Sequence, residues 1–223
     1  MSYLIVVAHP DDEVLGAGAT IRKLTQQGEE VNVCVLCGQA QARAGLSSEL
    51  DTEMRQCLDM LGVKDLFVGN FPNIKMNTTA HLELVQFIEK AIMATGASHI
   101  ITHHPADVNN DHHHTAIACQ AAARLFQRRS DVPKLKELLF MEVASSTEWA
   151  LDPSVNAFRP NTFVETGKEG IDYKIQALAC YKGVMRPYPH PRSEEAILGL
   201  AAFRGSQAGV CYAEAFETAF RSF

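Results

Sequence analysis

The stretch YLIVVAHPDDEVLGAGATIRKLTQQG, residues 3–28, decides the fold. Its first part, residues 3–9, is a short apolar run rich in β-branched residues and predicts a buried strand. Residues 14–27 then carry apolar side chains at helical spacing, and Gly28 is a typical helix stop. A strand that leads straight into a helix is the first half of a βα unit, from which parallel sheets are built.

The same alternation continues along the chain, with no Gly/Ser-rich linker and no internal repeat. Repeated βα units build a parallel sheet with helices on both faces. Residues 1–223 are therefore predicted to form one α/β domain with a Rossmann-like, mostly parallel sheet. The further strands are expected at residues 31–38, 65–70, 98–105, 136–149 and 160–167, and the further helices at residues 48–61, 81–95, 113–129, 171–183 and 193–209.

Composition excludes several classes of function. The formal net charge of -6 argues against nucleic-acid binding, which requires clustered Lys and Arg. No apolar run approaches the roughly 18 residues of a membrane span, and the opening lacks the basic flank of a signal peptide. A soluble, cytoplasmic protein is expected. The six cysteines fit reduced thiols, and because no second pair accompanies Cys34 and Cys37, a structural role is expected for both.

Two polar clusters follow predicted strands. HPDDE (9–13) comes after the first strand of the chain, and HHPADVNNDHHHT (103–115) ends the fourth strand and follows it. Ligands of such sheets bind beyond the carboxyl ends of the strands, so the two clusters are expected to meet. An imidazole and three carboxylates within five positions are costly unless something binds their charge. A metal ion is the obvious candidate.

The spacing of these residues suits a catalytic zinc site. His9 and Asp12 are three residues apart in a turn that enters a helix, which lets a nitrogen and an oxygen converge on one ion. Catalytic zinc takes three protein ligands and keeps one position open, and His112 is predicted as the third ligand. Asp11 would then be free to take a proton from water activated by the metal. This combination hydrolyses amides or esters.

Neighbouring residues are expected to support the site. Asp107 and Asp111 are predicted to hold the imidazoles in the required tautomer. One of His103 and His104 is expected to pack while the other faces the crevice, and residues 113–114 are expected at the surface or behind the ligands. The alternative for HPDD is an ordinary turn whose carboxylates favour the helix N-terminus.

Two other motifs are set aside. Gly16 and Gly18 lie inside the predicted helix and position 21 is Ile, so the dinucleotide-binding fingerprint fails. Residues 111–113 spell the DHH of a phosphoesterase family, but the aspartate-rich metal motifs of those enzymes are missing. That activity stays a minor alternative.

The segment AHPDDE (8–13), followed by Asp107-x-x-x-Asp111-His112, resembles the PIG-L/LmbE-like family of zinc-dependent N-deacetylases. PHPRS (189–193) and AEAF (213–216) also resemble the tail of this family. The resemblance implies zinc, or another divalent metal such as Fe²⁺ or Mn²⁺, and removal of an acetyl group from an acetamido sugar. It assigns the metal ligands as His9, Asp12 and His112 and the general base as Asp11.

The second motif departs from the family pattern. Many relatives have His-Pro-Asp-His where this chain has residues 109–112, Asn-Asn-Asp-His. The resemblance gives the first histidine a role in stabilising the oxyanion or protonating the leaving amine. Asn109 can donate a hydrogen bond to an oxyanion but cannot shuttle a proton. The amine is then expected to receive its proton from His190, or else from Asp11.

Two charged residues are predicted to contact the substrate. Arg192 is expected to hold a substrate carboxylate or phosphate, with neutralisation of the acidic cluster as the alternative. Glu142, late in a predicted strand near the same edge, is expected to contact substrate hydroxyls.

The leading functional hypothesis is removal of an N-acetyl group from an acetamido sugar or sugar nucleotide, in surface-glycan biosynthesis. One alternative is a metal-dependent hydrolase of another amide or of a phosphoester. The other is a non-catalytic sugar-binding protein. Since several relatives assemble, a homo-oligomer is left open.

Overall fold

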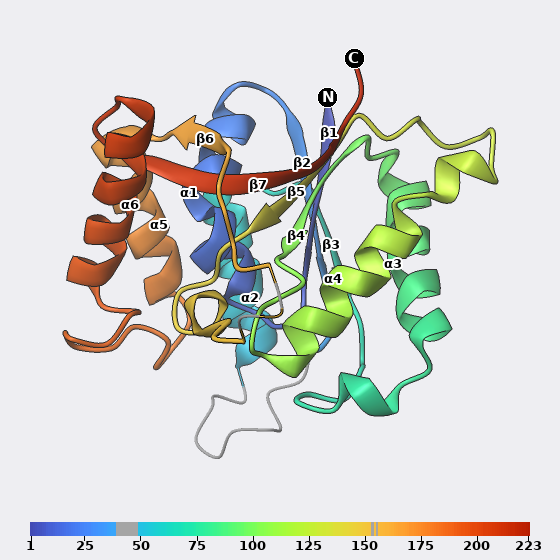
Figure 1. Cartoon of the computed structure of the whole chain (residues 1–223), viewed down its shortest axis with the longest axis horizontal. Helices are drawn as coiled ribbons and strands as arrows, with labels where there is room; N and C mark the ends of the chain where they lie inside the picture. The colour runs from blue at the N-terminus through green and yellow to red at the C-terminus, as the bar shows by residue number, and fades with distance from the viewer. Residues whose placement is uncertain (39–48, 153, 155) are drawn as a thin grey trace.

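The computed structural model describes residues 1–38, 49–152, 154 and 156–223. Within them one seven-stranded sheet, in the order β3-β2-β1-β4-β5-β7-β6, is covered by helices on both faces (Figure 1). This confirms the predicted α/β architecture with a mostly parallel sheet. The strands are β1 Ser2–Val7, β2 Glu30–Val35, β3 Asp65–Val68, β4 His99–His103, β5 Glu137–Met141, β6 Thr162–Glu165 and β7 Ala213–Arg221.

Helices cover the two faces unequally. α3 and α4 pack on one face and the other four α-helices on the opposite face (Figure 1). No helix in the described ranges is long and apolar enough to pass through a lipid bilayer. The helices are α1 Asp12–Gln26, α2 Leu50–Leu61, α3 His81–Thr95, α4 Asn110–Ala122, α5 Gly167–Ala179 and α6 Glu194–Ala208, with short 3₁₀ helices η1 Met76–Thr78, η2 Leu125–Gln127 and η3 Thr147–Trp149.

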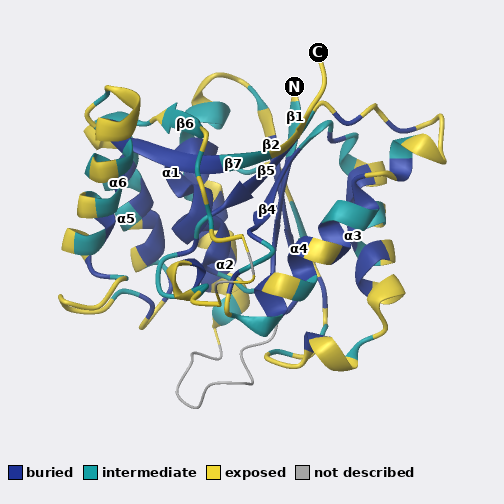
Figure 2. Ribbon diagram, viewed as in Figure 1, coloured by how far each residue is buried: buried dark blue, intermediate teal, exposed yellow. Residues whose placement is uncertain are grey.

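The first strand is the centre of the fold. β1 pairs in parallel with β2 on one side and with β4 on the other. Leu4 and Val6 point into the core under α3 and α4, whereas Ile5 and Val7 point into the core under α1 and α2. Because both faces are buried, as the dark blue strands of Figure 2 show, the strand is apolar throughout rather than alternating.

The C-terminal third differs from the prediction. AEAF (213–216) was assigned no strand, yet it begins β7, which lies antiparallel between β5 and β6. Ala and Glu have little intrinsic preference for strands, so the pairing partners decide this element. The strand predicted over residues 136–149 ends at Met141.

Two predicted helix boundaries also move. The helix predicted from residue 113 begins at Asn110, because the Asn109 side chain caps it by accepting the Asp111 N–H. The helix predicted over residues 48–61 is described from Leu50, and position 48 lies outside the described residues.

Candidate metal centre

The turn between β1 and α1 presents the first two metal-site residues. Asp11, the N-cap of α1, has a left-handed backbone with φ 99°. The Asp12 carboxylate folds back over the turn and accepts the backbone N–H of His9 at 2.9 Å. The turn therefore fixes the imidazole of His9 and the carboxylate of Asp12 side by side.

The third residue comes from the adjacent strand. β4 lies next to β1 in parallel, so the start of α4 reaches the same sheet edge. Asp12 Oδ2 lies 3.3 Å from His9 Nδ1 and 3.1 Å from His112 Nε2. Ligand atoms of all three residues lie within 4.8 Å of one another. Two imidazole nitrogens and one carboxylate oxygen are a typical donor set for catalytic zinc.

Two further carboxylates orient the imidazoles. Asp107 lies 3.1 Å from His112 Nδ1, which leaves Nε2 of that ring facing Asp12. Asp111 lies 3.0 Å from His9 Nε2, which leaves Nδ1 facing Asp12. Carboxylates that hold the outer nitrogen of a ligand histidine fix its tautomer and raise its basicity. Asp107 and Asp111 each contact the outer nitrogen of one of these histidines, and their role in fixing the tautomers stays a prediction.

The loop after β5 supports this arrangement with residues that the sequence analysis did not assign. Ser146 Oγ and Thr147 Oγ1 donate to Asp107 Oδ2 at 2.9 and 2.7 Å. Ser146 Oγ also lies 3.3 Å from His112 Nδ1. Nothing in the local sequence signals these contacts, because they join positions 34 to 40 residues apart.

The charges of the site are suited to a cation. Burial disfavours the charged forms, yet Asp111 and Asp12 raise the pKa of His9 to about 9, and Asp12 and Asp107 raise that of His112 to about 10. Although burial alone would raise the pKa of Asp12, His112 and His9 hold it well below its usual range. The carboxylates thus draw positive charge into a buried site, and a divalent cation can take the place of the two protons. The donor set fits a divalent metal.

Asp11 stands apart from the three candidate ligands. Its Oδ2 accepts a hydrogen bond from Arg192 Nη1 at 3.0 Å. Burial and the neighbouring Asp12 raise the pKa of Asp11 above its ordinary value, and Arg192 opposes this shift. The carboxylate of Glu13 accepts the backbone N–H of Asp11. The Tyr181 hydroxyl donates to this Glu13 carboxylate at 2.6 Å. Asp11 is thus a buried carboxylate beside the metal donors.

The Arg192 side chain contacts the HPDDE cluster, and its expected contact with a substrate carboxylate or phosphate stays a prediction. Its guanidinium bonds Asp11 and, through Nε, Ser145 Oγ at 3.1 Å. The neighbouring His190 is exposed, and its Nδ1 accepts the backbone N–H of Arg192. A role for His190 in protonating the amine stays a prediction.

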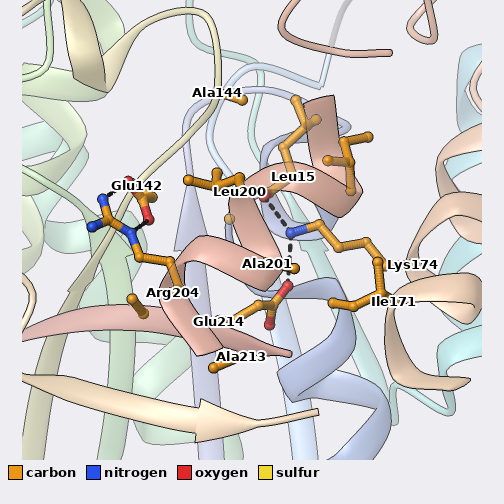
Figure 3. A pocket seen from close by; sticks show the side chains of 13 residues that line it. Leu15, Glu142, Ala144, Ile171, Lys174, Leu200, Ala201, Arg204, Ala213 and Glu214 are labelled. Carbon is orange, nitrogen blue, oxygen red and sulfur yellow. Dashed lines mark hydrogen bonds and ion pairs between the residues drawn. The ribbon is translucent and has the colours of Figure 1, made fainter. Parts of the chain in front are cut away.

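Glu142 follows β5 and is bound by Arg204, which donates to both of its oxygens at 2.7 and 2.6 Å (Figure 3). The pair lines one side of a cavity of about 30 Å³, and the buried pair of Lys174 and Glu214 lines the other. A contact between Glu142 and substrate hydroxyls stays a prediction, as does an oxyanion contact from Asn109.

His103 and His104 divide as expected. His103 faces the metal donors, stacks on His112 with ring centroids 3.9 Å apart, and accepts the Ala8 N–H. Burial lowers the pKa of His103 to about 3, so it stays neutral. His104 instead packs edge-on against Phe140 and Phe158.

Cys37 lies closer to the site than the sequence indicated. Its Sγ is 3.8 Å from Asp111 Oδ2, and together with His9 they form a second group that could hold an ion. Burial and Asp111 raise the pKa of the Cys37 thiol, so without a bound cation the neutral thiol is favoured. Cys34 is fully buried in the core, so a structural role fits both thiols.

Backbone strain concentrates at the same edge. In the described part of the chain, the non-glycine residues with positive φ are Asp11, Ile74 at 59° and Ser145 at 81°. Each costs of order 1–3 kcal/mol and persists only where the surroundings impose it. Ile74 donates its N–H to Asp111, and Ser145 bonds Arg192, so both strained residues support groups of the site.

A Rossmann-like sheet that carries a candidate His–Asp–His donor set and an adjacent carboxylate outside that set defines a candidate metallohydrolase. Residues 4–123, more than half of the chain, match the PIG-L family model, described as GlcNAc-PI de-N-acetylase. The chain belongs to this family, which confirms the resemblance found in AHPDDE.

Among curated proteins, a probable N-acetyl-α-D-glucosaminyl L-malate deacetylase 2 from Bacillus cereus is 35% identical over 124 residues. That match covers 49% of this chain and 54% of the relative, so the chain spans about half of the relative's length.

Solved structures share the fold. The N,N'-diacetylchitobiose deacetylase of Pyrococcus horikoshii has a TM-score of 0.77 at 19% identity. The match covers 97% of this chain and 83% of the deacetylase chain. GalB, the 4-carboxy-2-hydroxymuconate hydratase of Pseudomonas putida KT2440, has a TM-score of 0.76 at 20% identity. The match covers 100% of this chain and 97% of the GalB chain. The fold therefore accommodates more than one reaction, and the site must decide the function.

Proposed function

We propose that this protein is a metal-dependent N-deacetylase that hydrolyses the acetamido group of a sugar or sugar nucleotide, with zinc as its metal. The observation that carries the proposal is the convergence of His9, Asp12 and His112 beside Asp11, a buried carboxylate outside the donor set. Family membership supports the reaction class. Surface-glycan biosynthesis rests on the sequence resemblance and a cytoplasmic location on the cysteine usage and apolar pattern of the sequence; both belong to the same proposal.

A divalent metal held by the three donors supplies Lewis-acid polarisation of the amide carbonyl and makes water more acidic. Asp11 accepts the proton of the water that attacks the acetyl carbon. Arg192 holds the Asp11 carboxylate in place through the 3.0 Å contact, so that its proton-accepting oxygen stays oriented. The supporting contacts to His9 and His112 from Asp111 and Asp107 keep the donor nitrogens pointed inward.

The second half of the reaction breaks the bond between the acetyl carbon and nitrogen. The leaving amine needs one proton, which Asp11 can return after accepting it from water, or which His190 can supply. The side-chain oxygen of Asn109 accepts the backbone N–H of Asp111, and its side-chain NH₂ group is the part that can donate to an oxyanion. The products are acetate and a free amino sugar.

Acetate release from purified protein tests this proposal. Zinc-loaded protein is incubated with a panel of N-acetylated sugars and sugar nucleotides, and mass spectrometry follows loss of the acetyl group. The same samples are assayed for phosphate, because the phosphoester alternative predicts phosphate instead. Chelation followed by addition of Zn²⁺, Fe²⁺ or Mn²⁺ identifies the metal. Full activity after exhaustive chelation, or hydrolysis of no acetamido compound, would overturn the proposal.

A further inference from the structure

Exposed apolar side chains gather around the carboxyl edge of the sheet. Among the described residues, other large exposed apolar side chains lie on α-helices or near the chain ends. Single exposed apolar residues are normal on a protein surface, but a group confined to one edge indicates a binding surface. We call this group the apolar rim; it comprises Val68, Ile74, Val108, Trp149, Leu151 and Tyr188.

Hydrogen bonds tie the apolar rim to the metal donors. The backbone N–H of Trp149 donates to the Ser146 carbonyl at 3.1 Å, and Ser146 Oγ lies 3.3 Å from His112 Nδ1. In the connection between β3 and α3, the backbone N–H of Ile74 donates to Asp111, which contacts His9. The backbone of Trp149 is therefore bonded to Ser146, whose side chain touches the candidate ligand His112.

Trp149 has the chemistry of a sugar-binding surface. It is 56% exposed although it ends a 3₁₀ helix whose first residue, Thr147, is buried and bonded to Asp107. A pyranose ring has one apolar C–H face, and an aromatic ring can cover that face while the hydroxyl groups stay solvated. A loop that is bonded to Asp107 through Ser146 and Thr147 and exposes an indole is suited to this packing.

We propose that Trp149 is a specificity-determining residue whose indole packs on the sugar ring of the acetamido substrate. The accepted class is then acetamido pyranosides, with the acetamido group at the metal donors and the ring against the apolar rim. This inference rests on the proposed function and deepens it. Because it makes ground-state contact with the ring and not with the reacting atoms, Trp149 should change KM and leave kcat nearly unchanged.

The chain contains one tryptophan, so its emission reports on this position alone. Zinc-loaded protein is titrated with methyl N-acetyl-β-D-glucosaminide, and emission and acrylamide quenching are recorded. A saturable blue shift with reduced quenching is expected, because the sugar ring shields the indole from water. Emission that does not respond while acetate is still released would overturn the inference.

Kinetics provide a second, independent readout. Trp149→Ala is expected to raise KM about tenfold, since aromatic packing contributes about 1.4 kcal/mol. Trp149→Phe keeps an aromatic ring and should recover most of the affinity. The matched control is Met93→Ala near the C-terminus of α3, which removes a 39% exposed apolar side chain at the opposite edge of the sheet, where the Thr95 carbonyl accepts a hydrogen bond from Ser2 at the start of β1. A wild-type KM in Trp149→Ala would overturn the inference.

The two proposals fail in different ways. If no acetamido sugar yields acetate but the emission still shifts on titration, the proposed reaction is wrong and the sugar-binding surface stands. If acetate is released with equal KM by wild type and Trp149→Ala, the reaction stands and the inference falls. If Trp149→Ala instead converts a dimer to a monomer in sedimentation velocity, the rim is a contact between copies, and the inference also falls.

Discussion

The two halves of the sheet contribute to the site in different ways. The half built on β1 and β4 supplies the groups with chemistry, His9, Asp12 and His112, from turns directly after adjacent parallel strands. The half built on β5, β6 and β7 supplies groups that hold two neighbouring carboxylates in place: Ser146 and Thr147 bond Asp107, and Arg192 bonds Asp11. Arg192 reaches Asp11 across 181 positions of sequence. Chemistry is thus encoded locally, whereas its positioning depends on contacts made by the folded chain.

The largest expected effect follows removal of the proposed base in the first half. Asp11→Asn keeps the shape and the Arg192 contact but cannot accept a proton, so turnover should fall about 10³-fold. Metal content, measured by elemental analysis of the dialysed protein, should stay at the wild-type value. Turnover near that of wild type would remove Asp11 as the base.

Loss of a ligand in the same half should act on the metal first. His112→Ala removes one of three donors, and we expect bound zinc and turnover to be lost together. His113→Ala, an exposed neighbour on the same helix, is the matched control and should bind zinc normally. Equal zinc content in both variants would assign the ligand role to another residue.

In the second half, the buried pair of Lys174 and Glu214 should matter for stability. Lys174→Met leaves Glu214 with two backbone N–H donors but no counter-charge, which should lower the free energy of unfolding by about 3 kcal/mol. Urea denaturation measures this. Lys168→Met, which breaks an exposed pair with Asp172, should cost less than about 1 kcal/mol. Equal losses would show that burial of the pair is unimportant.

Arg192 connects the two halves, and its variants sharpen the comparison. If it positions Asp11, Arg192→Ala should lower kcat by about 10- to 100-fold with little change in KM, because misplacement of a catalytic group acts on the chemical step. Arg192→Lys should recover part of the rate. A rise in KM at unchanged kcat would show instead that Arg192 holds the substrate.

The smallest effect concerns pH and His104. Burial lowers the pKa of His104, against the opposing influence of Glu217 and Asp107. In the unfolded chain, His104 has the ordinary histidine pKa of about 6.5 and binds a proton more readily than in the folded protein. The free energy of unfolding should therefore fall as the pH drops through that value. His104→Gln cannot titrate, so its unfolding free energy should change less than that of wild type between pH 7 and pH 5. Identical pH profiles in chemical denaturation would contradict this.

The sequence determined the first half of the sheet almost completely. The apolar run before HPDDE indicated β1, because a strand buried on both faces is a continuous apolar run. The helical spacing after HPDDE indicated α1. Parallel pairing of β1 and β4 then brought the two polar clusters to one edge, as residues 9–12 and 107–112 show. The candidate donors, the proposed base and the carboxylates that contact the two histidines all lie within these two segments.

Only the tertiary structure decided the rest. β7 forms because β5 and β6 offer it backbone partners on both sides, although Ala and Glu, which make up five of its nine residues, have weak strand preference. Arg192, Ser146 and Thr147 acquire their roles through side-chain contacts between distant segments, which no local pattern records. Periodicity and short spacings reflect forces within one element of structure, whereas contacts across elements depend on how the whole chain packs.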